Sequence, residues 1–260
     1  MISMNCIGSN GKLGNQMFQY ATLRSLAKKF NYNYCLPTIS HRYYTGSNLY
    51  DCFKLNNEHR EDTSLYQIKQ EESSLSFDEN IFTKCPDNVD LNGYFQNVRY
   101  FESNKEDIKK SFTFFDHILD VAKSYFYSTF LTEEVISLHI RRDDYLNFSH
   151  HPVQSIDYYF NALKLFDENL KVLIFTDDIE WASNQELFKS ERFFFSRNND
   201  DAVDLCMQTF CKYHIIANST YSWWGAWLSD TKKVVKPKLW FAPPLENNEN
   251  FLSVDGWVIL

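Results

Sequence analysis

Short apolar runs alternate with segments of helical periodicity throughout the second half of the chain, and few folds accommodate this alternation. Strands are predicted over residues 135–140, 172–176, 193–196, 214–217 and 233–236, and helices over residues 155–167, 179–188, 201–212 and 221–228. The strands are apolar along nearly their whole length, which is typical of parallel strands buried on both faces. Because crossover helices join parallel neighbours, we expect an α/β fold whose sheet carries helices on both faces.

The first of these helices shows the periodicity clearly. Ser155 precedes it and is a favoured N-cap residue. Apolar side chains then recur with the spacing of one helix face, at Ile156, Tyr159, Phe160 and Leu163. We therefore expect these four side chains to face the core.

The N-terminal half begins with the same strand–helix pattern, and the pattern then becomes irregular. Residues 2–7 predict a strand, residues 8–16 a glycine-containing loop and residues 16–30 a helix with a buried stripe at Leu23, Leu26, Ala27 and Phe30. Residues 38–112 predict loops and short helices, with one strand near residues 89–95. A boundary within residues 124–132 then gives two domains, 1–128 and 129–260.

Composition excludes several classes of protein. The chain carries 26 Lys and Arg against 34 Asp and Glu, a net charge of −8, which argues against a nucleic-acid binder. No apolar run reaches the roughly 18 residues that a membrane span requires, and the first residues have no signal-peptide pattern. The six cysteines form no CxxC pair, so we expect reduced core cysteines and no zinc site.

Two adjacent arginines follow the first predicted strand of the second half. Ligands of parallel sheets bind beyond the carboxyl ends of the strands, where His139, Arg141, Arg142 and Asp144 lie. Guanidinium groups bind phosphate oxygens as planar forks, so the pair predicts a diphosphate site. Asp144 would hold an arginine in place, and His139 would bond to a base or sugar. The alternative is a surface cluster of ion pairs.

Polar residues also end the other strands. Asp177 and Asp178 follow the second strand, where Asp178 alone suffices as an N-cap. The fourth strand is followed by Asn218, Ser219 and Thr220, which precede the helix of residues 221–228. Small polar residues at a helix start suit an anion, although capping explains these residues almost as well. Asp204 lies in the first turn of a helix, where the dipole favours a carboxylate, and it can also accept the N–H groups of guanine.

Three further features concern the ligand. Asn15, in the loop of residues 8–16, can donate to a phosphate or sugar oxygen, although this loop lacks the GxGxxG and GxxxxGK[ST] patterns. The chain has no D-x-D triplet, so we expect no divalent metal, and arginines with helix N–H groups must stabilise a departing diphosphate. Trp223, Trp224 and Trp227 predict interior or interdomain packing, with stacking on an acceptor as the alternative.

Four stretches together resemble glycosyltransferase family 11, the α-1,2-fucosyltransferases. They lie in order along almost the full chain and are GKLGNQMFQYA (residues 11–21), HIRRDDY (residues 139–145), FTDD (residues 175–178) and NSTYSWWGAW (residues 218–227). The H-x-R-R-x-D pattern is shared with α-1,6- and protein O-fucosyltransferases, whereas the first and last stretches are typical of family 11. The sequence departs from the family at Asp143, where Gly is usual, and we expect this carboxylate to point away from the diphosphate.

The resemblance implies a GT-B-like fold of two facing Rossmann-like domains with parallel sheets. The N-terminal domain would serve the acceptor and the C-terminal domain would bind GDP-β-L-fucose. It further implies inverting transfer to the 2-hydroxyl of a terminal galactose, without a metal or other cofactor. Carried over by position, the residues that bind GDP-fucose would be Asn15, Gln16, His139, Arg141, Arg142, Asp177, Asp204, Asn218, Ser219 and Thr220.

Catalysis would depend on Arg141, which neutralises the leaving group, and on a base for the acceptor hydroxyl. His151, Asp144 and Asp177 are the candidate bases, and a dissociative reaction needs no strong base. An α-1,6 linkage, another nucleotide-sugar donor and a non-catalytic sugar- or nucleotide-binding protein stay open as alternatives. By analogy with the family we expect a bacterial cytoplasmic enzyme of O-antigen synthesis, with no transmembrane segment and with peripheral contact at the inner face of the membrane allowed.

Overall fold

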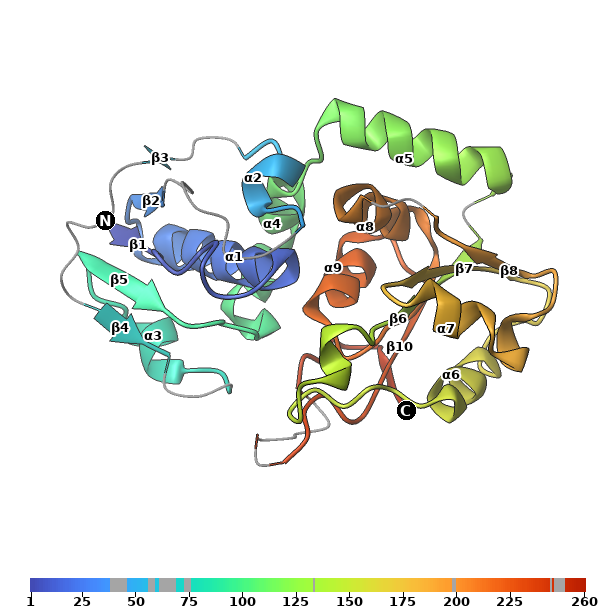
Figure 1. Cartoon of the computed structure of the whole chain (residues 1–260). Coiled ribbons are helices and arrows are strands. Elements are labelled where there is room, and N and C mark those ends of the chain that lie inside the picture. Colours follow the sequence, from blue (N-terminus) through green and yellow to red (C-terminus); the bar gives the residue numbers. More distant parts are fainter. Residues whose placement is uncertain are drawn as a thin grey trace. The chain divides into compact units, whose positions relative to one another are not determined.

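The computed structural model divides the chain into two compact units, Met1–Phe115 and Asp116–Leu260, each built on a parallel sheet (Figure 1). It describes residues 1–37, 46–55, 59–60, 69–72, 76–132, 134–197, 200–243, 245 and 251–260. The boundary lies one helix earlier than the predicted division at 128/129. Helix α5 (Asp116–Thr129) belongs to the second unit because its buried stripe packs on α8 (Asp201–Phe210), with the Phe126 and Phe210 rings 5.5 Å apart.

The first unit has a five-stranded parallel sheet in the order β3-β2-β1-β5-β4. Its strands are β1 (Ile2–Ser3), β2 (Tyr34–Leu36), β3 (His59–Arg60), β4 (Lys69–Glu71) and β5 (Val89–Asn92). Its helices are α1 (Leu13–Phe30), α2 (Leu49–Cys52), α3 (Glu79–Lys84), α4 (Lys105–Ser111) and the short 3-10 turns η2 (Val98–Tyr100) and η3 (Glu102–Asn104). The order places β1 in the centre, next to β5.

The strand predicted over residues 2–7 is too long. The chain leaves the sheet after Ser3 and turns, because the N–H of Ile7 bonds the carbonyl of Met4 and the N–H of Asn10 bonds that of Cys6. Helix α1 follows and is buried around most of its surface, including Leu23, Leu26 and Ala27 of the predicted stripe. The strand near residues 89–95 is confirmed as β5 but ends at Asn92. Part of the irregular region 38–112 lies outside the described residues.

The second unit has a six-stranded parallel sheet in the order β11-β10-β9-β6-β7-β8. Its strands are β6 (Val135–Ile140), β7 (Lys171–Thr176), β8 (Phe193–Phe195), β9 (Tyr213–Ile215), β10 (Lys233–Lys236) and β11 (Val258–Ile259). Its helices are α5, α6 (Ile156–Leu163), α7 (Ile179–Ser183), α8 and α9 (Thr220–Leu228), with 3-10 turns η4 (Asp144–Leu146) and η5 (Glu186–Phe188). The predicted α/β alternation is confirmed, and β11, α5 and the 3-10 turn η4 were not predicted.

Helix α6 faces the core with most of the predicted stripe, since Tyr159 and Leu163 are buried and Ile156 packs against the core. Ser155 caps it as expected by accepting the N–H of Tyr158 at 3.3 Å. Phe160, however, is 46% exposed, whereas Tyr158 is buried and donates its hydroxyl to the carbonyl of Ile216 at 2.7 Å. The buried face of the helix therefore includes Tyr158 in place of Phe160, because this hydroxyl bond is available only to a buried tyrosine.

The core holds the aromatic and sulfur-containing residues that the sequence assigned to it. Trp223, Trp224 and Trp227 are buried and pack on one another, with ring centroids 5.0–5.8 Å apart. The interior interpretation of these tryptophans is therefore correct. All six cysteines are buried and lie outside any disulfide, as expected.

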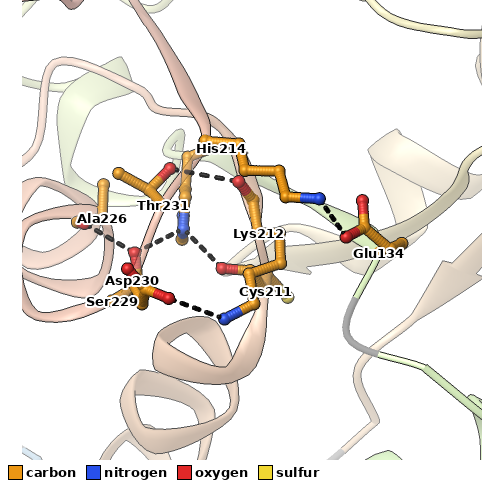
Figure 2. Close-up of polar contacts among 9 residues, drawn as sticks. Glu134, Cys211, Lys212, His214, Ala226, Ser229, Asp230 and Thr231 are labelled. Carbon is orange, nitrogen blue, oxygen red and sulfur yellow. Dashed lines mark hydrogen bonds and ion pairs between the residues drawn. The ribbon is translucent and has the colours of Figure 1, made fainter.

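A polar network ties β9 to the ends of α8 and α9 at the amino edge of the second sheet (Figure 2). The Nε2 atom of buried His214 lies 3.1 Å from the carbonyl of Cys211 and 3.0 Å from the Ser229 hydroxyl. Ser229 donates in turn to the carbonyl of Ala226 at 2.7 Å. An ion pair between Lys212 and Asp230 lies beside it. Burial lowers the pKa of His214 to about 3, so this histidine is a neutral part of the scaffold.

Candidate active site

The predicted site residues of the second unit gather at the carboxyl ends of β6, β7, β8 and β9, which are neighbours in the sheet. Beyond β6 the chain continues to β7 and β8 on one side, while β9, β10 and β11 fill the other side. The chain order thus reverses between β6 and β9. Open α/β sheets bind ligands at such a switch point, because the two loops diverge there and leave a crevice.

The two arginines after β6 are held by three aspartates. Arg141 contacts Asp144 at 2.6 Å and Asp177 at 2.9 Å. The Nε of Arg142 donates to Asp178 at 3.0 Å, and its backbone N–H donates to Asp177 at 2.8 Å. These contacts fix both guanidinium planes. The ion pairs engage the Nη2 and Nη1 atoms of Arg141.

Trp181 supports the second arginine from α7. The Arg142 guanidinium lies 3.9 Å from the centre of its indole ring, in cation–π geometry. Asp178 serves the same arginine and also caps α7 by accepting the N–H of Trp181 at 3.0 Å. The N-cap interpretation of Asp178 is therefore confirmed, and one carboxylate does both tasks. No sequence pattern indicated the part played by Trp181.

Electrostatics in this cluster reflect partial burial. Burial raises the pKa of Asp177, although the Arg141 charge and the N–H groups of Arg142 and Asp143 oppose the shift. Burial lowers the pKa of Arg141, but Asp177 and Asp144 outweigh it and leave that pKa raised, so the guanidinium is always charged. Asp143 is exposed, unlike Asp144.

His139 lies at the end of β6 and is 5% exposed. Its Nδ1 is 2.9 Å from the hydroxyl of Ser222 in α9, which links the two sides of the switch point. Burial, with a further contribution from the Arg141 charge, lowers the pKa of His139 to about 3. The ring is therefore neutral and acts as a hydrogen-bonding group, without a charge to offer a phosphate.

The start of α9 is positioned by the loops around it. The amide of Asn218 donates to the carbonyls of Pro152 at 3.0 Å and Trp240 at 2.9 Å. Tyr145 donates its hydroxyl to the carbonyl of Asn218 at 3.0 Å. Ser219 is the N-cap residue of α9 but its side chain makes no capping bond, and Thr220 begins the helix. The first N–H groups of α9 thus lie at the switch point, where they favour an anion.

Asp204 and His151 occupy the borders of this region. Asp204 accepts the hydroxyl of Ser196, which follows β8, at 2.6 Å, so it stands beyond the third predicted strand. The ring of His151 stacks on Tyr145 with centroids 4.7 Å apart. Burial and the charge of Arg141 lower the pKa of His151, while Asp144 partly offsets them. His151 is therefore neutral at neutral pH, as a proton acceptor must be.

Two predicted residues, Asn15 and Gln16, lie in the first unit. Both ends of the Gln16 amide bond the backbone: Nε2 donates to the carbonyl of Gly11 at 3.3 Å and Oε1 accepts the N–H of Leu49 at 3.0 Å. Gln16 is 3% exposed and shapes the glycine loop from within. Asn15 Oδ1 accepts a bond from Gln96 at 2.8 Å, and sequence analysis missed Gln96.

Two features of the described residues bear on metal binding and on membranes. Within those ranges no group of three or more His, Cys, Asp or Glu side chains is placed to hold a metal ion. No helix among them combines the length and apolar character needed to cross a bilayer.

Comparison with known proteins agrees with this fold. The chain is 30% identical over 266 residues to an alpha-1,2-colitosyltransferase of Escherichia coli, covering 89% of this chain and 90% of that protein. It is 29% identical over 302 residues to the O-antigen biosynthesis glycosyltransferase WbnK of Escherichia coli, covering 96% and 98%. The crystal structure of NodZ alpha-1,6-fucosyltransferase soaked with GDP-fucose matches with a TM-score of 0.59 at 12% identity, over 95% of this chain and 98% of that one.

The two parallel-sheet units give the chain a GT-B-like α/β fold, like that of the solved structures of NodZ and POFUT1. The model of glycosyl transferase family 11 matches residues 1–260, and the chain belongs to that family. The resemblance inferred from the four sequence stretches is confirmed.

The two buried histidines predict a specific dependence of stability on pH. Their pKa values are about 3 in the folded chain against 6.5 for an ordinary histidine, so the unfolded chain binds protons that the folded chain does not. The free energy of unfolding should therefore fall as pH drops from 6.5 toward 3, by up to about 1.4 kcal/mol per pH unit for each histidine. Urea unfolding between pH 5 and 7 measures this slope.

The variants His139→Asn and His214→Asn separate the two contributions. Each substitution should reduce the slope of the unfolding free energy against pH by up to about 1.4 kcal/mol per pH unit, the contribution of one proton. We expect only His139→Asn to disturb the candidate site as well, because His214 lies at the opposite edge of the sheet. A slope equal to that of the parent in either variant would show that folding does not lower the pKa of that histidine.

Proposed function

We propose that this chain transfers L-fucose from GDP-β-L-fucose to the 2-hydroxyl of a terminal galactose, with inversion and without a metal ion. The observation that carries the proposal is the pair Arg141 and Arg142, oriented by carboxylates at the switch point beside the start of α9. Membership of family 11 supports it. The names of the two Escherichia coli relatives support a setting in O-antigen synthesis and an α-1,2 linkage. The bacterial cytoplasm, at the inner face of the membrane, is the proposed location.

In the proposed reaction the bond between fucose C1 and the β-phosphate oxygen breaks while the acceptor oxygen bonds C1 from the opposite face. Negative charge develops on the departing phosphate and positive charge on the sugar ring. The N–H groups of Arg141 and those at the start of α9 stabilise this charge more in the transition state than in the ground state. Because Asp144 and Asp177 have already fixed the guanidinium, little reorganisation is needed when the charge appears.

The remaining site residues bind the nucleotide-sugar or accept the proton of the acceptor hydroxyl. We assign Asp204 to the guanine N–H groups, His139 to a base or ribose hydrogen bond, and Asn15 to an oxygen of the donor. The proton of the acceptor hydroxyl goes to His151. Asp144 and Asp177 are less suited to this task, because both already pair with Arg141.

A second donor is favoured by one specific observation. The relative at 30% identity is an alpha-1,2-colitosyltransferase, and colitose is L-fucose without its 3-hydroxyl. The arginine pair and the helix start recognise the diphosphate, which both donors share. They do not discriminate between the two sugars, so GDP-colitose is the second candidate.

A donor screen tests the proposed function. We expect transfer from GDP-fucose to galactosides, an α-1,2 linkage in the product and an unchanged rate in EDTA. UDP-galactose should be inactive, and GDP-mannose should be poor because it is not an L-6-deoxy sugar. Product analysis by mass spectrometry and NMR gives the sugar and linkage. Turnover with GDP-colitose alone would show that the donor is GDP-colitose and not GDP-fucose. Loss of activity in EDTA would contradict the metal-independent step.

Replacement of Arg141 tests the diphosphate clamp. Arg141→Ala removes a donor to the developing charge, and loss of one such donor typically costs about 10²–10³ in rate. We expect transfer to fall below detection, with GDP binding weakened and the circular-dichroism spectrum unchanged. Arg99→Ala, which removes a surface ion pair with Glu79 in the first unit, is the matched control and should keep parental turnover. Near-parental turnover in Arg141→Ala would remove this arginine from the mechanism.

The proposed base predicts the pH–rate profile. His151 accepts a proton only when neutral, and its pKa lies below 6.5. The acidic limb of kcat/KM should therefore lie below pH 6.5 in the parent and be absent from His151→Ala. The variant should also lose about 10²-fold in rate, the lower range for a positioned base. An acidic limb shared by parent and variant would exclude His151.

A further inference from the structure

Tyr145 lies in the 3-10 turn η4, directly after the paired arginines, and its ring approaches two residues of the proposed reaction. The centre of the ring is 5.4 Å from the guanidinium carbon of Arg141, within range of a cation–π interaction. The ring of His151 stacks on it, with centroids 4.7 Å apart and an angle of 21° between the planes. One side chain thus lies beside both the arginine of the diphosphate clamp and the proposed base.

The hydroxyl of Tyr145 fixes the position of this ring. It donates to the carbonyl of Asn218 at 3.0 Å. Asn218 is 1% exposed, and its own amide is tied to the carbonyls of Pro152 and Trp240, so the acceptor is held firmly. Burial, opposed by the charge of Arg141, raises the pKa of Tyr145 to about 12. The hydroxyl therefore keeps its proton near neutral pH and remains a donor.

Ring contacts orient the imidazole of His151. The backbone N–H of His151 bonds the carbonyl of Phe148 at 3.1 Å, which fixes the main chain alone. The side-chain Nδ1 atom is buried and has no hydrogen-bond partner among the described residues. The rings of Phe241 and Phe148 lie 5.4 Å and 6.4 Å from the imidazole and are inclined to it by 54° and 79°. Of these three neighbouring rings, Tyr145 is the nearest and the most nearly parallel.

The charged groups around His151 come from the same loop and from the end of β6. Burial lowers the pKa of His151, Asp144 opposes this shift, and His150 and Arg141 reinforce it. Asp144 pairs with Arg141 at 2.6 Å, so its charge is largely compensated. Because packing against Tyr145 contributes to the burial, loss of that ring should return the pKa of His151 toward the ordinary value of 6.5.

Arg141 depends much less on the Tyr145 ring. Its guanidinium is held by Asp144 at 2.6 Å and by Asp177 at 2.9 Å. The ring, at 5.4 Å, is close to the limit of roughly 6 Å at which cation–π attraction is significant. Removal of the ring should therefore displace His151 and leave the arginine in place.

We propose that Tyr145 is a positioning residue: its hydroxyl, held by the Asn218 carbonyl, fixes the plane of its ring, and that ring orients His151 beside the arginine pair. The inference rests on the proposed function, since His151 receives the proton of the acceptor hydroxyl there. Tyr145 acts through His151 and needs no contact with the reacting atoms.

Two substitutions separate the ring of Tyr145 from its hydroxyl. Tyr145→Leu should lower kcat/KM above pH 7 by about 10²-fold, the loss typical of a group displaced by about 1 Å. Its affinity for GDP, measured by calorimetry, should equal that of the parent, because the aspartates hold Arg141. Tyr145→Phe keeps the ring and loses one neutral hydrogen bond, so kcat/KM should fall by about tenfold at most. Loss of GDP binding in Tyr145→Leu, or equal losses of kcat/KM in the two variants, would overturn the proposal.

Tyr213→Leu is the matched control. Tyr213 is half-buried like Tyr145, its hydroxyl donates to Glu134 at 2.8 Å, and its ring lies 5.8 Å from that of Phe166. It begins β9 and therefore stands at the amino edge of the same sheet, away from the candidate site. The control removes the same atoms as Tyr145→Leu, and its kcat/KM should equal that of the parent.

The pH profile supplies a readout that a merely structural role would not move. In Tyr145→Leu the acidic limb of kcat/KM should move up toward pH 6.5, whereas Tyr145→Phe and Tyr213→Leu should keep the parental limb. In a His151→Ala background either substitution of Tyr145 should lower kcat/KM by no more than about twofold, because the residue that it positions is gone. Multiplicative losses in the double variants, or a parental limb in Tyr145→Leu, would contradict the positioning role.

A titration without substrate separates this inference from the proposed function. NMR of ¹³C-labelled imidazole carbons gives the pKa of His151, with the signal assigned from its loss in His151→Ala. This pKa should rise in Tyr145→Leu and stay parental in Tyr145→Phe and Tyr213→Leu. If the enzyme uses another donor or another base, the proposed function fails while the rise still shows that Tyr145 orients the imidazole. A parental pKa of His151 in Tyr145→Leu would end the positioning role whatever sugar is transferred.

Discussion

The ion pairs of Arg141 and Arg142 with three aspartates are the interactions on which the candidate site of the second unit depends. A chain with a net charge of −8 must concentrate positive charge locally to bind an anion. Both guanidinium groups are partly buried, so each needs a carboxylate nearby to remain there at acceptable cost. Asp144, Asp177 and Asp178 meet this need from the loops after β6 and β7, and they also fix the direction in which the remaining N–H groups point.

The same topological device serves both units. In the second unit the loops after β6 and β9 bring the arginines to the start of α9, and the His139–Ser222 contact joins them. In the first unit the loops after β1 and β5 are joined by Gln19 and by the Gln96–Asn15 contact. In each case parallel strands deliver two loops to one edge of the sheet, and a buried polar side chain sets their separation.

Where the predictions failed, tertiary contacts explain the failure. Phe160 was expected in the core, but Tyr158 takes that direction because its hydroxyl reaches the carbonyl of Ile216. Helix α5 was not predicted, since several of its large apolar side chains, such as Tyr125 and Tyr127, are exposed and blur its amphipathic pattern. The domain boundary shifted with it, because packing on α8 assigns α5 to the second unit.

The sequence by itself determined the alternation of strands and helices in the second unit, the burial of the tryptophans and the family, because each of these is written in local periodicity or in short contiguous stretches. It also placed the paired arginines at a strand end. Only the tertiary structure decided which side chains face one another. Asn15 and Gln96 are 81 positions apart, and His139 and Ser222 are 83 apart. A hydrogen bond across such a separation has no periodic signature, since it exists only once parallel strands have brought the two loops to the same edge of a sheet.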